Sequence, residues 1–313
     1  MTLKDKYLQH VSVVRRYSSR TVEIYGDILS RFLSFAGTEA PSEALTPAMV
    51  RNYEAYLLDE KGESPRTVNL HLSVLSGFSR FLVREGALKS NPVKLVHRPK
   101  TSKRLPQVFR QEDLDRYLQD TAPNAAEDAL DLITGSDKVS ASVWRRRRDR
   151  LIVRILYDTG LRRSELIGLD RGNLDFSRRT IKVKGKGGKM REIPITASLS
   201  EEILLYLEAT RRFLGRDEVP LLLTERGARL YPMAVERIVK EETGGVGVTG
   251  KRSPHVLRHT IATGLLEEGA DLNSIKELLG HSSLAATQVY THNSIEKLRS
   301  TYAKAHPRAG KKD

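Results

Sequence analysis

One stretch of the sequence holds an unusual concentration of side chains that can do chemistry. Residues 253–292 read SPHVLRHTIATGLLEEGADLNSIKELLGHSSLAATQVYTH and contain four of the chain's eight histidines. The groups that stand out are His255, Arg258, His259, His281 and Tyr290. A helical core needs none of them, so their order calls for a chemical explanation.

The motif SPHVLRH predicts the start of a helix. Ser253 is a favourable N-cap and Pro254 a favourable first residue, so His255 falls in the first turn, where free N–H groups and the helix dipole favour an anion. Arg258 shares that face. The pair indicates either a phosphate cradle or ordinary surface capping, and His259 is expected to be a packed or hydrogen-bonded support.

The His-x-x-x-His spacing of this motif is also a zinc pattern. However, Val256 stands where a zinc protease carries its general-base glutamate, and the chain contains no cysteine. Zinc is therefore disfavoured, and we expect neither a metal nor another cofactor.

The segment LLGHSS predicts a helix that ends at Gly280 and is followed directly by His281. Taken alone, a histidine here is more often a capping or core residue. Tyr290, in LAATQVYTH, is by itself an ordinary half-buried aromatic residue. Each of these two motifs is weak evidence for a functional site when it is taken without the others.

Two further motifs place cations at turns. In TGLRRSEL, Arg162 and Arg163 follow a helix break at Thr159-Gly160, and Glu165 is close enough to orient Arg162; an exposed basic helix start is the alternative. In VKGKGGKMR, Lys186 lies at the tip of a glycine-rich hairpin. A Walker A loop is excluded because Val183 and Met190 occupy positions that require Gly and Ser/Thr. Lys186 either reaches a ligand or is a solvated turn lysine.

Composition restricts the class of protein. The 313 residues are 39% hydrophobic and 29% charged, with a formal net charge of +14, which favours a polyanionic partner, nucleic acid first. Apolar runs long enough to cross a membrane and a signal-peptide core are absent from the sequence. We therefore expect a cytoplasmic protein without membrane association.

The chain divides into three parts. Residues 1–93 show helical periodicity and start and stop signals, and predict a bundle of about four helices. Residues 94–106, KLVHRPKTSKRLP, hold five basic and no acidic residues and predict a linker that is also a strap, here called the basic segment. Residues 107–313 predict a mostly helical α+β domain with a small sheet, in which RTIKVKGKGGKMREIPIT forms a hairpin. The stretch 121–143 is polar and predicts a loop or a weak extra helix.

The motifs TGLRRSEL, GKGGKMR, HVLRH, LGHSS and VYTH, in this order, resemble the catalytic domain of tyrosine recombinases, the phage integrase family. The helical first part and the basic segment are similar to Xer-type bacterial members, with a SAM-like core-binding domain. The stretch 121–143 is longer than in compact members. The resemblance points to six catalytic residues, Arg162, Lys186, His255, Arg258, His281 and Tyr290.

The resemblance implies a transesterification that needs neither metal nor ATP. Arg162 and Arg258 would bind nonbridging phosphate oxygens, and His255 and His281 would hydrogen-bond the same phosphate. Lys186 would protonate the leaving 5′-oxygen, and Tyr290 would attack to give a 3′-phosphotyrosine. A non-catalytic DNA-binding relative, a topoisomerase-like activity, a mobile element's integrase and, remotely, a metallohydrolase stay open as alternatives.

The resemblance also implies the partners. They are double-stranded DNA with paired inverted half-sites, a homo- or heterotetramer with a second recombinase, and a DNA translocase as regulator. In the tail, Ile295, Leu298 and Tyr302 share one face of an expected helix. We expect this tail helix to dock on a neighbouring subunit, as the resemblance implies, and to steady Tyr290. Docking back on its own subunit is the alternative.

Overall fold

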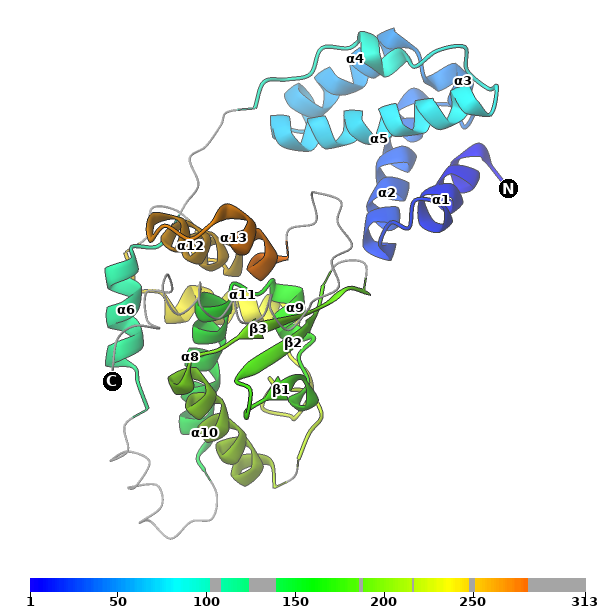
Figure 1. Cartoon of the computed structure of the whole chain (residues 1–313). Coiled ribbons are helices and arrows are strands. Elements are labelled where there is room, and N and C mark those ends of the chain that lie inside the picture. Colours follow the sequence, from blue (N-terminus) through cyan, green and yellow to red (C-terminus); the bar gives the residue numbers. More distant parts are fainter. Residues whose placement is uncertain (102–107, 124–138, 186–187, 216, 248–250, 281–313) are drawn as a thin grey trace. The chain divides into compact units, whose positions relative to one another are not determined.

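The chain folds into two compact units, Met1–Arg104 and Leu105–Asp313, each with its own hydrophobic core (Figure 1). The computed structural model describes residues 1–101, 108–123, 139–185, 188–215, 217–247 and 251–280. The expected loop or helix at 121–143 lies largely outside these residues, and the expected tail helix lies wholly outside them.

All regular elements in the described part of the first unit are helical, as the periodicity predicts. Its elements are α1 (Leu3–Val13), α2 (Ser19–Ala36), α3 (Pro41–Ala44), α4 (Pro47–Ala55), a π-helical turn η1 (Tyr56–Glu60), α5 (Pro65–Arg84) and a 3-10 turn η2 (Pro92–Leu95). The side chains of Ser18, Thr46 and Ser64 cap α2, α4 and α5 by accepting a backbone N–H three residues on. These caps satisfy donors that a helix start otherwise leaves unpaired.

The start of the basic segment packs on the first unit instead of running free. Val96 is buried in the core of this unit. The Asn69 side chain on α5 donates to the carbonyl of Pro99 at 2.9 Å, and Arg98 donates to the hydroxyl of Ser73 at 2.9 Å. Arg98 also donates to the carbonyl of Asn69 at 3.4 Å. One buried valine and three hydrogen bonds therefore hold this part of the segment along α5, which the lack of apolar periodicity did not predict.

The second unit combines helices with a small antiparallel sheet, as predicted. Its elements are α6 (Gln111–Asp120), α8 (Ala141–Thr159), α9 (Arg163–Ile167), η3 (Arg171–Asn173), β1 (Leu174–Asp175), β2 (Thr180–Lys184), β3 (Met190–Pro194), α10 (Ala197–Leu214), α11 (Pro232–Glu242), α12 (Pro254–Glu267) and α13 (Leu272–Leu279). The strand order is β1-β2-β3, and β2 pairs with β3 in the predicted hairpin. The two-residue strand β1 is too short to give a sequence signal. Within the described ranges, no helix has the length and apolarity to span a membrane.

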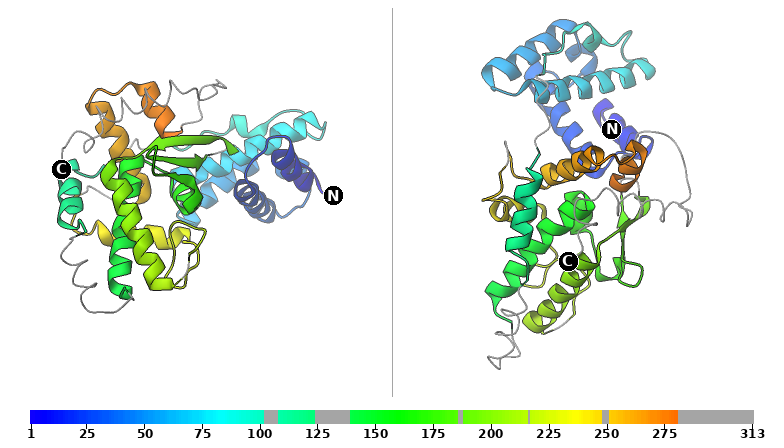
Figure 2. Two further views of the ribbon diagram at one scale, coloured as in Figure 1. Left: turned by 60° about the horizontal axis from the view of Figure 1, so that its bottom comes forward. Right: turned by 60° about the vertical axis from the view of Figure 1, so that its left-hand side comes forward.

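Helix α8 is the central element of the second unit. The helices α10, α11 and α12 all pack against it, and Figure 2 shows α10 running beside it. Its second half is buried on every side, although the sequence WRRRRDRLIVRILYDT is rich in charge. Burial of so many charged groups requires partners inside the unit.

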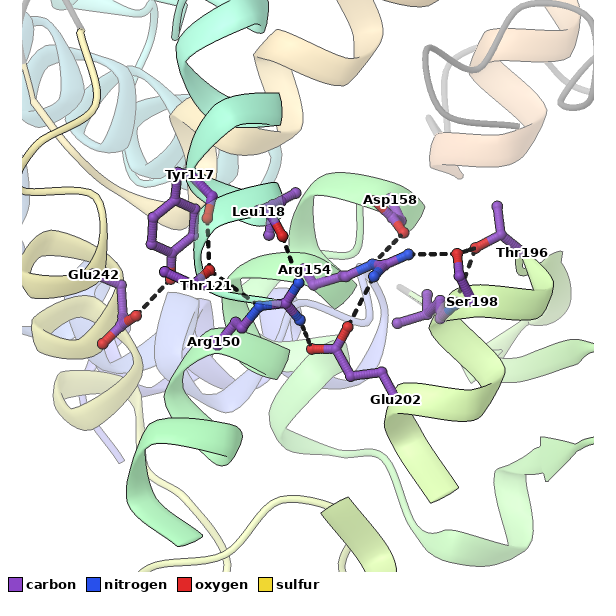
Figure 3. Close-up of polar contacts among 11 residues, drawn as sticks. Tyr117, Leu118, Thr121, Arg150, Arg154, Asp158, Thr196, Ser198, Glu202 and Glu242 are labelled. Carbon is purple, nitrogen blue, oxygen red and sulfur yellow. Dashed lines mark hydrogen bonds and ion pairs between the residues drawn. The ribbon is translucent and has the colours of Figure 1, made fainter. Parts of the chain in front are cut away.

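A buried network supplies these partners (Figure 3). The carboxylate of Glu202 on α10 accepts from Nη1 of Arg150 and, at 2.9 Å, from Nη1 of Arg154, both on α8. The remaining guanidinium donors bond the carbonyl of Leu118, the hydroxyls of Thr121 and Ser198, and the carboxylate of Asp158. The network therefore joins α6, α8 and α10.

We expect Glu202→Ala to lower the free energy of unfolding by about 3–5 kcal/mol, because two buried guanidinium groups lose their shared carboxylate. Urea denaturation measures the change. The matched control is Glu208→Ala on the same helix, where the pair with Arg212 is exposed and should contribute less than about 1 kcal/mol. Equal losses in the two variants would contradict the structural role of the network.

Candidate active site

Three of the six expected catalytic residues, Arg162, His255 and Arg258, lie in the part of the chain that the structure describes. Lys186, His281 and Tyr290 lie outside the described residues. The site is therefore built here from the first three residues and the groups that hold them.

A sharp turn after α8 places Arg162. The helix ends at Thr159, and Gly160 follows with a φ of +61°, a left-handed conformation that favours glycine. Arg162 then forms the N-cap of α9. Its backbone N–H donates to Glu165 Oε2 at 2.9 Å and its Nη1 donates to Oε1 at 2.8 Å, so the prediction that Glu165 orients Arg162 is confirmed. The Arg162 side chain keeps 34% of its surface exposed.

Glu165 has a second arginine partner that the sequence did not reveal. Arg191 on β3 donates to both carboxylate oxygens of Glu165, from Nη1 at 2.9 Å and from Nη2 at 2.8 Å, and both residues are buried. Burial by itself raises the pKa of Glu165. The hydrogen bonds from Arg191 and from the backbone of Arg162 outweigh that effect and hold the pKa at about 2, so Glu165 is charged at neutral pH.

Arg258 is buried and bonded to backbone carbonyls. Its Nη1 donates to the carbonyl of Gly160 at 2.5 Å and its Nη2 donates to the carbonyl of Leu279 at 2.5 Å. Burial lowers the pKa of its guanidinium to about 10, with a further lowering from the nearby positive charge of Arg162. Arg258 is therefore charged at neutral pH but poorly solvated, which makes it ready to receive an anion.

The C-terminal end of α13 is the place where these side chains meet. The helix ends at Leu279, and Gly280 follows with a φ of +65°, as LLGHSS predicts. Arg162 Nη2 donates to the carbonyl of Gly280 at 2.7 Å. Arg162 and Arg258 thus bind two successive carbonyls, directly before His281 in the sequence.

His255 occupies the predicted first turn of α12, with Ser253 as the N-cap. It is exposed, and its Nε2 lies 2.9 Å from Nε2 of His259. One of these two nitrogens must carry the proton that the other accepts. Burial lowers the pKa of His259, and the neighbouring charge of His255 lowers it further. The prediction that His259 is a hydrogen-bonded support is confirmed.

Arg163 is directed to a different partner. It forms an ion pair at 2.6 Å with Glu236 on α11, and both side chains are about two-fifths exposed. Of the two arginines in TGLRRSEL, the structure therefore brings Arg162 to the site and uses Arg163 to join α9 to α11.

Four residues form the centre of the site, which we call the arginine–glutamate cluster: Arg162, Arg191, Arg258 and Glu165. Three positive charges and one negative charge leave an excess of two positive charges. Such an excess in a partly buried place favours an anion with two negative charges. Within the described residues, no three His, Asp or Glu side chains lie close enough together to hold a metal ion.

A sequence signal for Arg191 exists in the pattern of β3. In MREIP, the alternation of a strand puts Arg191 on the same side as Ile193, and both are buried whereas Met190 is exposed. A charged residue on the inward side of a strand requires a buried partner. The sequence does not show which carboxylate that partner is.

Comparison with known proteins gives the family. The profile of the "Phage integrase family" matches residues 126–297, and that of the "Phage integrase, N-terminal SAM-like domain" matches residues 5–86. The chain therefore belongs to the phage integrase family of tyrosine recombinases, which are DNA strand-exchange enzymes.

Full-length relatives agree with this assignment. The chain is 36% identical to a tyrosine recombinase XerC of Chlorobaculum parvum, over 97% of this chain and 94% of the relative, and 37% identical to that of Bacillus pumilus, over 98% and 96%. A solved structure of the XerH site-specific recombinase bound to palindromic difH substrate has the same fold, with a TM-score of 0.66 and 21% identity over 96% of this chain and 84% of that one.

The low pKa of Glu165 predicts a pH dependence of stability. An unfolded glutamate has a pKa of about 4.3, so Glu165 stabilises the fold fully above that value. The contribution is lost as the pH falls from about 4.5 towards 2, because the folded protein must then take up a proton. The difference in free energy of unfolding between the wild type and Glu165→Gln should therefore be largest near pH 7 and shrink over this range.

Urea denaturation at several pH values measures this difference. The control is Glu236→Gln, which removes an exposed ion pair and should change stability little. A wild-type advantage over Glu165→Gln that stays constant down to pH 2 would contradict the assignment.

Proposed function

We propose that this chain is a Xer-type site-specific recombinase that cuts and rejoins duplex DNA through a 3′-phosphotyrosine on Tyr290, and that it resolves chromosome or plasmid dimers. The support for the Xer type is the full-length identity with proteins named tyrosine recombinase XerC. The support for the chemistry is the arginine–glutamate cluster.

The convergence of Arg162 and Arg258 at the end of α13 carries the proposal. A phosphodiester has one negative charge, and attack by a phenolate oxygen brings a second one to phosphorus in the transition state. The two excess positive charges of the cluster match that dianion better than they match the substrate. Stabilisation of this kind lowers the barrier, since it grows as the transition state forms.

The bond changes balance without an external energy source. The Tyr290 oxygen forms a bond to phosphorus while the bond between phosphorus and the 5′-oxygen breaks. One phosphate ester replaces another, so a second strand's 5′-hydroxyl can reverse the step. Arg162 and Arg258 bind nonbridging oxygens, for which the planar guanidinium has the right geometry.

Two protons must move in this step. His255, exposed in the first turn of α12 and bonded to His259, accepts the proton of the Tyr290 hydroxyl and hydrogen-bonds the phosphate together with His281. Lys186 gives its proton to the departing 5′-oxygen. In the sequence, Lys186 stands two positions after Lys184, the last residue of β2.

The substrate in this proposal is double-stranded DNA with two inverted half-sites, cut by a homo- or heterotetramer under the control of a DNA translocase. The exposed side chains of Lys94, Arg98 and Lys100 on the basic segment provide positive charge for phosphate contacts, which supply affinity independent of sequence. The net charge of +14 agrees with such a partner.

We expect Tyr290→Phe to keep DNA binding and to abolish the covalent adduct, because phenylalanine lacks the attacking oxygen. Trapping on a nicked suicide substrate, read on a denaturing gel, measures the adduct. The control is Tyr231→Phe, which changes an exposed tyrosine at the start of α11 and should leave the adduct unchanged. An adduct of normal intensity with Tyr290→Phe would refute the nucleophile.

Lys186→Ala should slow cleavage of ordinary DNA by about 10²-fold or more if Lys186 is the general acid. A substrate with sulfur at the bridging 5′-position has a leaving group that needs no proton, and the variant should cleave it at nearly the wild-type rate. Single-turnover kinetics on both substrates provide the measurement. An equal defect on the two substrates would assign Lys186 to phosphate positioning instead.

A further inference from the structure

Three successive backbone carbonyls at the end of α13 each accept a hydrogen bond from a different arginine. Arg191 Nε donates to Leu278 O at 3.2 Å, Arg258 Nη2 donates to Leu279 O at 2.5 Å, and Arg162 Nη2 donates to Gly280 O at 2.7 Å. These carbonyls have no partner inside the helix and form the negative end of its dipole. The end of α13 thus gathers three cations.

Arg191 differs from the other two arginines in its position and partners. Its side chain is 6% exposed, and all three of its nitrogens donate inside the protein, two to Glu165 and one to Leu278. In contrast, Arg162 is one-third exposed and shares Glu165 with it. Arg191 therefore holds the carboxylate that orients Arg162 and does not itself face the substrate.

Two glycines leave room for the Arg191 guanidinium. A Cβ on Gly280 would lie 3.1 Å from Cζ and Nη1 of Arg191, and a Cβ on Gly185 would lie 3.3 Å from Nη1. Gly185 directly follows β2 and Gly280 directly follows α13, so one buried guanidinium lies against the ends of both elements. The residues that follow these glycines in the sequence are Lys186 and His281.

We propose that Arg191 is a positioning residue of the recombination reaction. It binds Glu165 and the end of α13 together, and so fixes the geometry in which Arg162 and Arg258 meet the phosphate. This inference rests on the proposed function, because it concerns the phosphate that Tyr290 attacks. A lysine cannot replace Arg191, since it has no planar fork for both oxygens of Glu165 and a third bond to Leu278.

The test compares Arg191→Lys with the control Arg154→Lys. Arg154 is also a buried arginine and bonds two carboxylates, but it belongs to the network around Glu202 shown in Figure 3. Single-turnover formation of the covalent adduct is measured at saturating suicide substrate, below the temperature at which either variant unfolds. We expect Arg191→Lys to be about 10–10²-fold slower, as for other displaced catalytic groups, with half-site affinity within about threefold of the wild type. Arg154→Lys should lose stability but keep the rate.

A second substrate separates positioning from a general structural defect. A methylphosphonate at the scissile position is neutral. Its transition state therefore has less negative charge for the arginines to stabilise. The defect of Arg191→Lys should shrink on this substrate relative to the wild type. A normal rate for Arg191→Lys, or an equal defect on both substrates, would overturn the proposal. Failure of the wild type to form any adduct would instead refute the proposed function.

Gly280→Ala provides an independent variant in case Arg191→Lys does not fold. Its control is Gly269→Ala, because Gly269 also has a positive φ, of +79°, and open space around its Cβ position. An alanine at either position has the strain of a positive φ. Only the Cβ added at Gly280 lies close enough to displace the Arg191 guanidinium. Adduct formation should slow by about tenfold or more in Gly280→Ala relative to Gly269→Ala. Equal rates would overturn the proposal.

Discussion

The second unit depends on one buried carboxylate, that of Glu165, held between two guanidinium groups. Without it, Arg162 and Arg191 would face each other in a poorly solvated place, where like charges repel strongly. With it, Arg162 is fixed at the start of α9, and Arg191 is fixed between the hairpin and the end of α13. The fold can therefore gather an excess of positive charge at the arginine–glutamate cluster without separating the elements that carry it.

Two groups of buried charges in the second unit are satisfied in different ways. In the network around Glu202, guanidinium groups and carboxylates join three helices, and each of the three nitrogens of Arg150 donates a hydrogen bond inside the protein. In the arginine–glutamate cluster, backbone carbonyls take the place of further carboxylates. Carbonyl dipoles hold an arginine without neutralising its charge, so the cluster keeps its excess of positive charge.

Most of the fold could be predicted from local patterns. Capping serines and threonines, the glycine that ends α8 at Gly160 and the alternation of β2 and β3 are properties of a few neighbouring residues, and the structure confirms them. The packing of Val96 on the first unit and the short strand β1 were missed. Both depend on contacts that a few residues make with distant parts of the chain, and a short local pattern cannot reveal them.

For the site, the sequence shows the order of the candidate groups, and the resemblance of its motifs to the tyrosine recombinases points to Arg162, Lys186, His255, Arg258, His281 and Tyr290 as the expected catalytic residues. The spacing also shows that Glu165 could reach Arg162, since residues three positions apart are neighbours on a helix. Only the tertiary structure decided that Arg191 shares Glu165, that Arg258 bonds the carbonyls of Gly160 and Leu279, and that three arginines meet at the end of α13. These contacts join residues from 21 to 118 positions apart, and their geometry follows from how the helices and strands of the second unit pack together, not from any local preference of the chain.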